Sequence, residues 1–178
     1  CALPISSGIL LPISSLPSPG GIGTMGAAAR EFVDFLHAAG QHYWQILPVC
    51  PTSYGDSPYQ SFSTFAGNPY FIDLDQLAEA GLLTPEEYRT IDWESAPDCI
   101  NYGVLYEKRY PVLRRACARL LANPPEDYEQ FLADNAFWLP DYALFMALKD
   151  AHGGKSWLEW ERPLRLRKPA ELDKDRRC

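Results

Sequence analysis

The sequence is short of the features that mark several large classes of protein. Lysine and arginine number 16 against 23 aspartates and glutamates, which leaves a net charge of −7. Nucleic-acid phosphates require a basic surface, and this balance does not provide one. No stretch approaches the roughly 20 apolar residues of a membrane-spanning helix. We therefore expect neither nucleic acid nor a membrane among its partners.

Cysteine and histidine are also sparse. The five cysteines are odd in number and none are spaced as C-x-x-C, so neither a disulfide framework nor a zinc site is predicted. No G-x-S-x-G elbow or Cys/His pairing marks a nucleophile. The apolar run ILLPISSLP is short, is broken by prolines and follows no basic region, so we predict no signal peptide. We expect no metal, no cofactor and a reducing cytoplasm.

The first fifty residues follow the pattern of a βαβ unit. SGILLPIS, residues 7–14, is a short apolar run typical of a buried strand. A helix is predicted over 27–39, because its apolar residues share one face and Gly40 is a natural stop. HYWQILPV, residues 42–49, is rich in aromatic and branched side chains and predicts a second strand. Two strands joined by one helix should lie parallel.

After Val49 the alternation of strand and helix stops. Short helices are predicted after Leu74 and after Thr84, which can cap a helix with Pro85 in its first turn. From Tyr102 onwards the pattern indicates only helices, and these are expected at about 103–122, 126–137 and 139–151. Two parallel strands cannot form a stable sheet alone. We therefore expect a helical insertion within a longer α/β chain.

GIGTMG, residues 21–26, matches the G-x-G-x-x-G of dinucleotide-binding folds. Such folds also place an Asp or Glu at the end of the second strand, and here that strand runs into LPVC without a carboxylate. We prefer the alternative that these glycines allow a sharp turn and close packing of strand and helix.

An irregular loop holds the densest chemistry of the chain. YGDSPYQSFSTFAGNPY, residues 54–70, interleaves aromatic rings with hydroxyls, amides and an aspartate. Pro58 and Pro69 bar a continuous helix, since each lacks a backbone N–H and restricts the residue before it. Such a loop can offer apolar faces and hydrogen-bonding groups to one ligand.

With its flanks, this stretch closely resembles the signature of amylomaltases, the 4-α-glucanotransferases or disproportionating enzymes. The resemblance starts at SGILLPISSLPSPGGIG, continues through FVDFLHAAGQHYWQILP, and resumes at NYGVLYEKRYPVL and WLPDYALFMALKDAHGGKSWLEW. It covers nearly the whole chain. Cys50 and Ser53 stand where the family more often has other residues, but they lie outside the sugar-contact motif.

The resemblance implies an α/β fold: the N-terminal part of a (β/α)8 TIM barrel of the α-amylase superfamily, with a mostly helical inserted subdomain. Residues 1–75 would hold the first two strands of the barrel and the sugar-site loop. Residues 76–178 would form the helical insertion, before the rest of the barrel. A bare barrel needs about 250 residues, which this chain does not have.

The resemblance also implies substrate-binding residues, because active sites lie at the C-terminal ends of barrel strands. Tyr59 would stack on the glucose beside the bond that is broken. The other loop residues would hydrogen-bond to sugar hydroxyls or brace the loop; they are Asp56, Ser57, Gln60 and Asn68. Tyr54 and Tyr102 resemble a second, outer glucan contact. We expect Phe62 and Phe65 to be core anchors.

The family's chemistry is retaining transfer of α-1,4-glucan segments between maltodextrins by double displacement. Its catalytic carboxylates come from later strands, and no stretch here matches their motifs, so no catalytic residue is assigned. The chain alone is expected to be inactive and to need the remainder of the barrel as a partner. Two alternatives stay open: another hydrolase or debranching enzyme of the α-amylase superfamily, and a stand-alone glucan-binding module.

Overall fold

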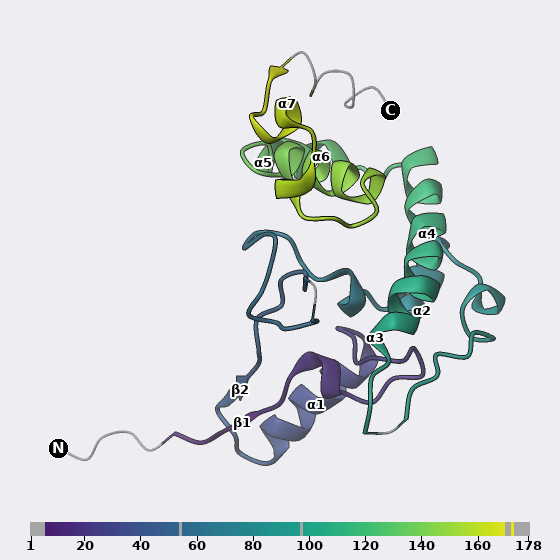
Figure 1. Ribbon diagram of the computed structural model, residues 1–178. Coiled ribbons are helices and arrows are strands. Elements are labelled where there is room, and N and C mark those ends of the chain that lie inside the picture. Colours follow the sequence, from purple (N-terminus) through teal and green to yellow (C-terminus); the bar gives the residue numbers. More distant parts are fainter. Residues whose placement is uncertain (1–5, 54, 97, 170–171, 173–178) are drawn as a thin grey trace. The chain divides into compact units, whose positions relative to one another are not determined.

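The computed structural model describes residues 6–53, 55–96, 98–169 and 172 (Figure 1). The chain divides into two compact units, Cys1–Pro124 and Pro125–Cys178. These units are the two parts of the chain that are each compact. The predicted boundary between barrel strands and helical insertion, at residues 75 and 76, concerns membership of the barrel and stays a prediction. No helix of the described ranges is long and apolar enough to cross a membrane.

The first unit opens with the predicted βαβ unit, in which two strands lie parallel with Gly8 opposite Tyr43 and Leu10 opposite Gln45. The strands are shorter than predicted, because Pro12 and Pro48 follow them and proline cannot donate to a ladder. The Leu11 N–H still donates to the Gln45 carbonyl at 3.0 Å, just beyond the first strand. The bounds are β1 Gly8–Leu10, α1 Ala27–Ala38 and β2 Tyr43–Gln45.

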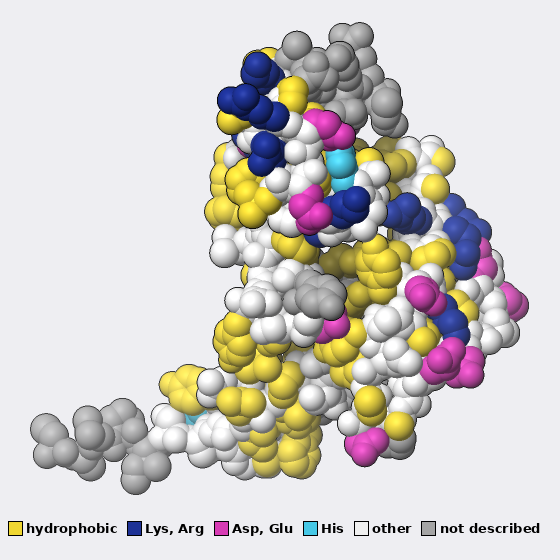
Figure 2. All heavy atoms as spheres, viewed as in Figure 1, with side chains coloured by type: hydrophobic (Ala, Val, Ile, Leu, Met, Phe, Trp, Pro, Cys, Tyr) yellow, Lys and Arg dark blue, Asp and Glu magenta, His cyan; other side chains and the backbone are white. Residues whose placement is uncertain are grey.

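Helix α1 ends as its sequence predicts, with Gly40 in the left-handed region at φ +67°. Phe32 packs edge-on against Trp44 of β2, with ring centroids 5.0 Å apart, and Leu36 is buried. Other apolar side chains of these three elements face solvent, and Figure 2 shows hydrophobic side chains gathered over this part of the first unit; they are Ile9, Leu10, Val33, Phe35 and Tyr43. Two strands are present in the described ranges, so the barrel itself is not contained there.

The rest of the first unit is a chain of short helical elements. Thr84 is a cap as expected and forms a capping box with Glu87, but the element that follows is only a single 3-10 turn. The helix predicted over 103–122 is present, with a π-helical turn inside it. The bounds are η2 Pro69–Phe71, α2 Leu74–Glu79, η3 Pro85–Glu87, α3 Tyr102–Val104, η4 Leu105–Arg109 (the π-helical turn) and α4 Tyr110–Ala122.

Arg109 ties three segments of this unit together. Its side chain has no exposed surface, and its guanidinium donates to the Gly20 carbonyl at 3.0 Å and to the Ile72 carbonyl at 2.7 Å. It also lies over the ring of Trp93, 5.8 Å from the centroid. The surrounding core is apolar and draws on residues from the whole unit, namely Ile22, Tyr70, Leu74, Leu83, Tyr88, Trp93, Leu105, Val112 and Ala116.

The second unit is helical, as predicted. Its core is formed by Leu148, Trp160 and Leu172. Helix α6 (Leu139–Ala151) is followed by Gly153 and Gly154, which both have positive φ, and the Gly154 N–H donates to the Lys149 carbonyl at 2.8 Å. The bounds are α5 Tyr128–Asp134, α6 Leu139–Ala151, η5 Trp157–Glu159 and α7 Arg162–Arg165.

Candidate functional site

The candidate site is the loop between β2 and η2, and Asn68 closes its base. The Asn68 N–H donates to the Val49 carbonyl at 2.8 Å, on the other side of the loop. Its side-chain oxygen accepts from the Tyr70 N–H at 3.0 Å, which caps η2. Because Asn68 is buried, the structure gives it the bracing role of the two roles expected for it. Its contact with a sugar hydroxyl stays a prediction.

The loop's central part is a small closed structure. Thr52 and Ser61 form an antiparallel bridge, and the Ser53 N–H donates to the Gln60 carbonyl at 3.0 Å. At the tip, the chain reverses through Gly55 and Asp56, at φ +90° and +53°. A positive φ is uncommon for any residue other than glycine, although aspartate tolerates it better than most. The tip is therefore held by its own backbone bonds in a specific shape.

Tyr59 projects from this tip with 74% of its surface exposed. Its N–H contacts the Ser57 hydroxyl at 3.4 Å, and the Gln60 N–H donates to the Ser57 carbonyl at 3.1 Å. An aromatic face is thus available beside hydroxyl and amide groups. This pairing of an apolar face with a few placed polar groups is what small-molecule sites use for orientation.

The prediction that both phenylalanines of this loop are core anchors is wrong for one of them. Phe65 is 61% exposed, because the Ser63 hydroxyl accepts from the Phe65 and Ala66 N–H groups at 3.1 Å and turns the chain there. Phe62 is partly buried. The sequence pattern could not separate the two rings, since both stand in the same irregular stretch.

Asp56 interacts electrostatically with tyrosines from other elements. Burial raises the pKa of its carboxyl group. Burial also raises the pKa of Tyr102, with the Asp56 charge as a further cause. Tyr70 has a raised pKa as well, first from burial, then from Tyr110 and Asp56. The structure therefore brings the predicted residues Asp56 and Tyr102 into one electrostatic neighbourhood. Tyr54, the expected partner of Tyr102, lies outside the described residues.

The described residues of this loop cannot perform the acid–base work of glycosyl transfer by themselves. That chemistry needs two carboxyl groups flanking the bond that breaks, and the pKa of Asp56 is raised by burial without a contribution from another carboxylate of the described ranges. Within those same ranges, no group of three or more His, Cys, Asp or Glu residues could hold a metal ion. The loop can bind and orient a ligand.

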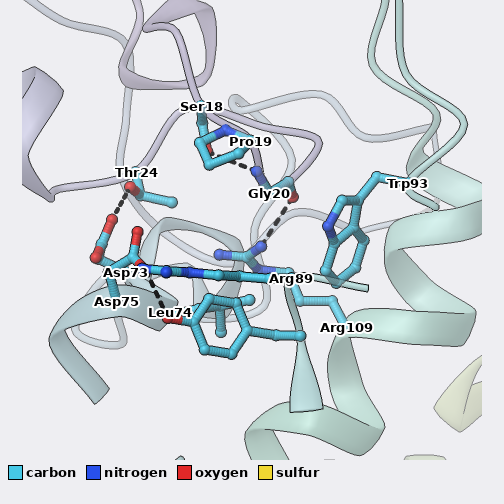
Figure 3. Close-up of a pocket in the computed structure, with 11 residues that line it drawn as sticks. Ser18, Pro19, Gly20, Thr24, Asp73, Leu74, Asp75, Arg89, Trp93 and Arg109 are labelled. Carbon is cyan, nitrogen blue, oxygen red and sulfur yellow. Dashed lines mark hydrogen bonds and ion pairs between the residues drawn. The ribbon is translucent and has the colours of Figure 1, made fainter. Parts of the chain in front are cut away.

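A separate pocket of about 330 Å³ lies beside Arg109, away from the loop (Figure 3). Its charges are paired within the protein: Arg89 contacts Asp75 at 2.7 Å, and Asp73 accepts from Thr24 and from the Gln76 N–H. These contacts join α2 to its neighbours. Sequence reasoning missed Arg109, because its carbonyl acceptors at Gly20 and Ile72 are 89 and 37 residues away.

The glycine-rich stretch at 21–26 is explained by close packing. A Cβ atom on Gly23 would lie 2.0 Å from the Ile13 carbonyl oxygen, and one on Gly26 would lie 2.0 Å from an Asp73 carboxyl oxygen. Gly21 has φ +80°. These positions need glycine for space and for conformation, which agrees with the preferred alternative to a nucleotide site.

Comparison with known proteins identifies the family. A family model described as 4-alpha-glucanotransferase matches residues 11–178. A 4-alpha-glucanotransferase of Clostridium butyricum is 51% identical over 162 residues, covering 91% of this chain and 33% of that protein. The Thermus thermophilus enzyme of the same name is 49% identical over 174 residues, covering 96% and 34%.

A solved structure agrees. It is titled as the amylomaltase from Streptococcus agalactiae in complex with acarbose, and it matches with a TM-score of 0.90 at 42% identity over 96% of this chain and 35% of that chain. The chain thus spans about a third of the length of the relatives it matches. Since the family model covers almost all of it, the chain belongs to the 4-alpha-glucanotransferase family.

Proposed function

We propose that this chain supplies part of the sugar-binding cleft of a 4-α-glucanotransferase, which transfers α-1,4-glucan segments between maltodextrins. The observation that carries the proposal is the loop after β2, where the exposed ring of Tyr59 stands beside the Ser57 hydroxyl. The ring would stack on the C–H face of a glucose unit. Its hydroxyls would form hydrogen bonds with Asp56, Ser57 and Gln60.

The remainder of a (β/α)8 barrel would supply the two carboxyl groups of a retaining double displacement. A sugar 4-hydroxyl would take the place of water as acceptor. The apolar surface around β1, α1 and β2 supports this partner, because it contains Leu10, Val33 and Tyr43, all exposed. Barrel strands bury such residues against their neighbours.

The cytoplasm is the expected location. Cys50, Cys99 and Cys117 are free thiols, and free cysteines are typical of reducing compartments.

The direct test is incubation of the 178-residue chain with maltotriose, alone and mixed with the remainder of the barrel, followed by separation of the products by size. The mixture should give a ladder from glucose to longer maltodextrins, and the chain alone should leave maltotriose unchanged. Products that are only shorter than maltotriose would indicate a hydrolase. A ladder from the chain alone would place the catalytic carboxylates within these residues and contradict the proposal.

A further inference from the structure

Four tyrosines form one cluster in the first unit, and the candidate sugar loop contacts this cluster electrostatically through Asp56. Tyr70 is at its centre: its ring centroid lies 6.1 Å from that of Tyr102 and 5.8 Å from that of Tyr110. Tyr106 packs edge-on against Tyr110 with centroids 5.4 Å apart. The Tyr70–Tyr110 and Tyr106–Tyr110 pairs are edge-to-face, an arrangement that aromatic rings prefer and that favours one orientation of each ring.

The three tyrosines at positions 102, 106 and 110 are four residues apart and run through the π-helical turn η4. In a regular α-helix, side chains four apart drift by about 40° around the axis, because a turn has 3.6 residues. A π-helical turn is wider and offsets this drift. Pro111 favours a wide turn, since proline has no N–H to donate to the Glu107 carbonyl and in a regular α-helix its ring would crowd that oxygen. The tyrosines are thereby brought closer to one line.

The exposure of these rings differs along the line. Tyr70 is buried and Tyr102 and Tyr110 are partly buried, whereas Tyr106 is 60% exposed. A ring that open adds little to the core, yet its orientation is fixed by Tyr110. Its ring partner Tyr110 is a phenol, and the charge of the Asp56 carboxylate acts on Tyr70 and Tyr102 of the same cluster. This mixed surface is unlike the apolar one around β1 and β2, and it suits a polyhydroxylated chain with C–H faces.

We propose that Tyr106 extends the outer glucan contact expected at Tyr102 by at least one further glucose unit. Tyr102 and Tyr106 then form a row that binds long α-glucans more tightly than maltose. This inference rests on the proposed function, because it takes an α-glucan as the ligand. Tyr106 is a binding residue for chain length and has no part in the bond-breaking steps.

The test is a calorimetric titration of the 178-residue chain with maltose and with maltoheptaose. We expect Tyr106→Ala to lower the affinity for maltoheptaose about fivefold, because the loss of one partly exposed aromatic contact costs less than the loss of a buried hot spot. The affinity for maltose should not change, because we expect the short sugar to bind at Tyr102 without reaching Tyr106. Tyr106→Phe keeps the ring and should behave as the wild type. Phe131→Ala is the matched control, since Phe131 is a half-exposed aromatic residue of α5.

The two sugars separate a local effect from a folding defect, because a damaged fold would lose both affinities. Equal affinities of wild type and Tyr106→Ala for maltoheptaose would overturn the inference. If Tyr102→Ala still weakened both sugars in that case, the outer glucan contact would stand without Tyr106. If the wild type bound neither sugar, the outer contact and this inference would both be wrong. The proposed transfer activity would then still be decided by the maltotriose products.

Discussion

Two surfaces of the first unit expose large side chains, and they do so for different physical reasons. Around β1, α1 and β2 the exposed groups are largely aliphatic or phenyl, including Leu10, Val33 and Phe35. Around the loop and η4 the exposed rings include Tyr59, Phe65 and Tyr106, and this stretch also carries hydroxyl, amide and carboxylate side chains. An apolar surface without hydrogen-bonding groups is best covered by protein. An aromatic surface with such groups can exchange water for sugar hydroxyls.

This comparison shows that exposure alone does not identify a binding site. Tyr43 and Tyr59 are both exposed tyrosines. Tyr43 lies on β2, which pairs with β1 at Gly8. A further strand could pair with the other edge of β2. Tyr59 lies at a tip that is closed by its own hydrogen bonds, so no further strand is needed there. Under the proposed function, the neighbouring backbone distinguishes Tyr43, which we expect protein to cover, from Tyr59, which we expect to contact a ligand.

The largest effect should come from Tyr59. In the barrel assembled with this chain, Tyr59→Ala is expected to lower the transfer rate on maltotriose about a hundredfold, because misplacing the sugar at the reacting bond costs that much. Phe62→Tyr, which adds a hydroxyl to a partly buried ring of the same loop, should change the rate far less. The measurement is the initial rate of glucose release. Similar losses in the two variants would mean that the loop is a packing motif rather than a sugar site.

The apolar surface should respond next. Leu10→Asp places a charge where we expect protein, and burying an unpaired carboxylate is costly. We expect the remainder of the barrel to associate at least about tenfold more weakly, as measured by recovery of transfer activity during titration. Leu121→Asp is the control, because Leu121 is similarly exposed on α4. Equal losses would show that the effect follows from added charge and not from the place.

Local patterns predicted much of this fold. The strand-helix-strand order, the stop at Gly40 and the helix Leu139–Ala151 follow from apolar spacing and glycine placement, which act within a few residues. The π-helical turn was missed, although Pro111 marks it, because the apolar period continues on both sides. Arg109 was missed because its buried state depends on carbonyls far along the chain.

The site shows the same limit. The composition of the loop predicts a ligand with both apolar and polar faces, and the resemblance supplies the sugar. The exposure of Phe65 depends on hydrogen bonds to Ser63, and the meeting of Asp56 with Tyr70 and Tyr102 depends on how distant segments pack. Contacts of that kind have no periodic signal in a sequence.

The smallest effect should come from Asp56. Its buried carboxylate lowers the stability of the fold, although we expect the same group to contribute to sugar binding. Because its pKa is raised in the folded state, the native protein binds more protons than the unfolded one between the ordinary pKa of 3.8 and the raised value. Stability therefore falls as pH rises through that window, and the cost of burying the charge is fully present above the raised pKa. Asp56→Asn keeps the shape and tolerates the positive φ. It should raise the midpoint of thermal unfolding slightly at pH 7, leave it unchanged at pH 3, and weaken maltoheptaose binding at pH 7. A lower midpoint at pH 7 would mean that the carboxylate stabilises the loop, which would contradict this prediction.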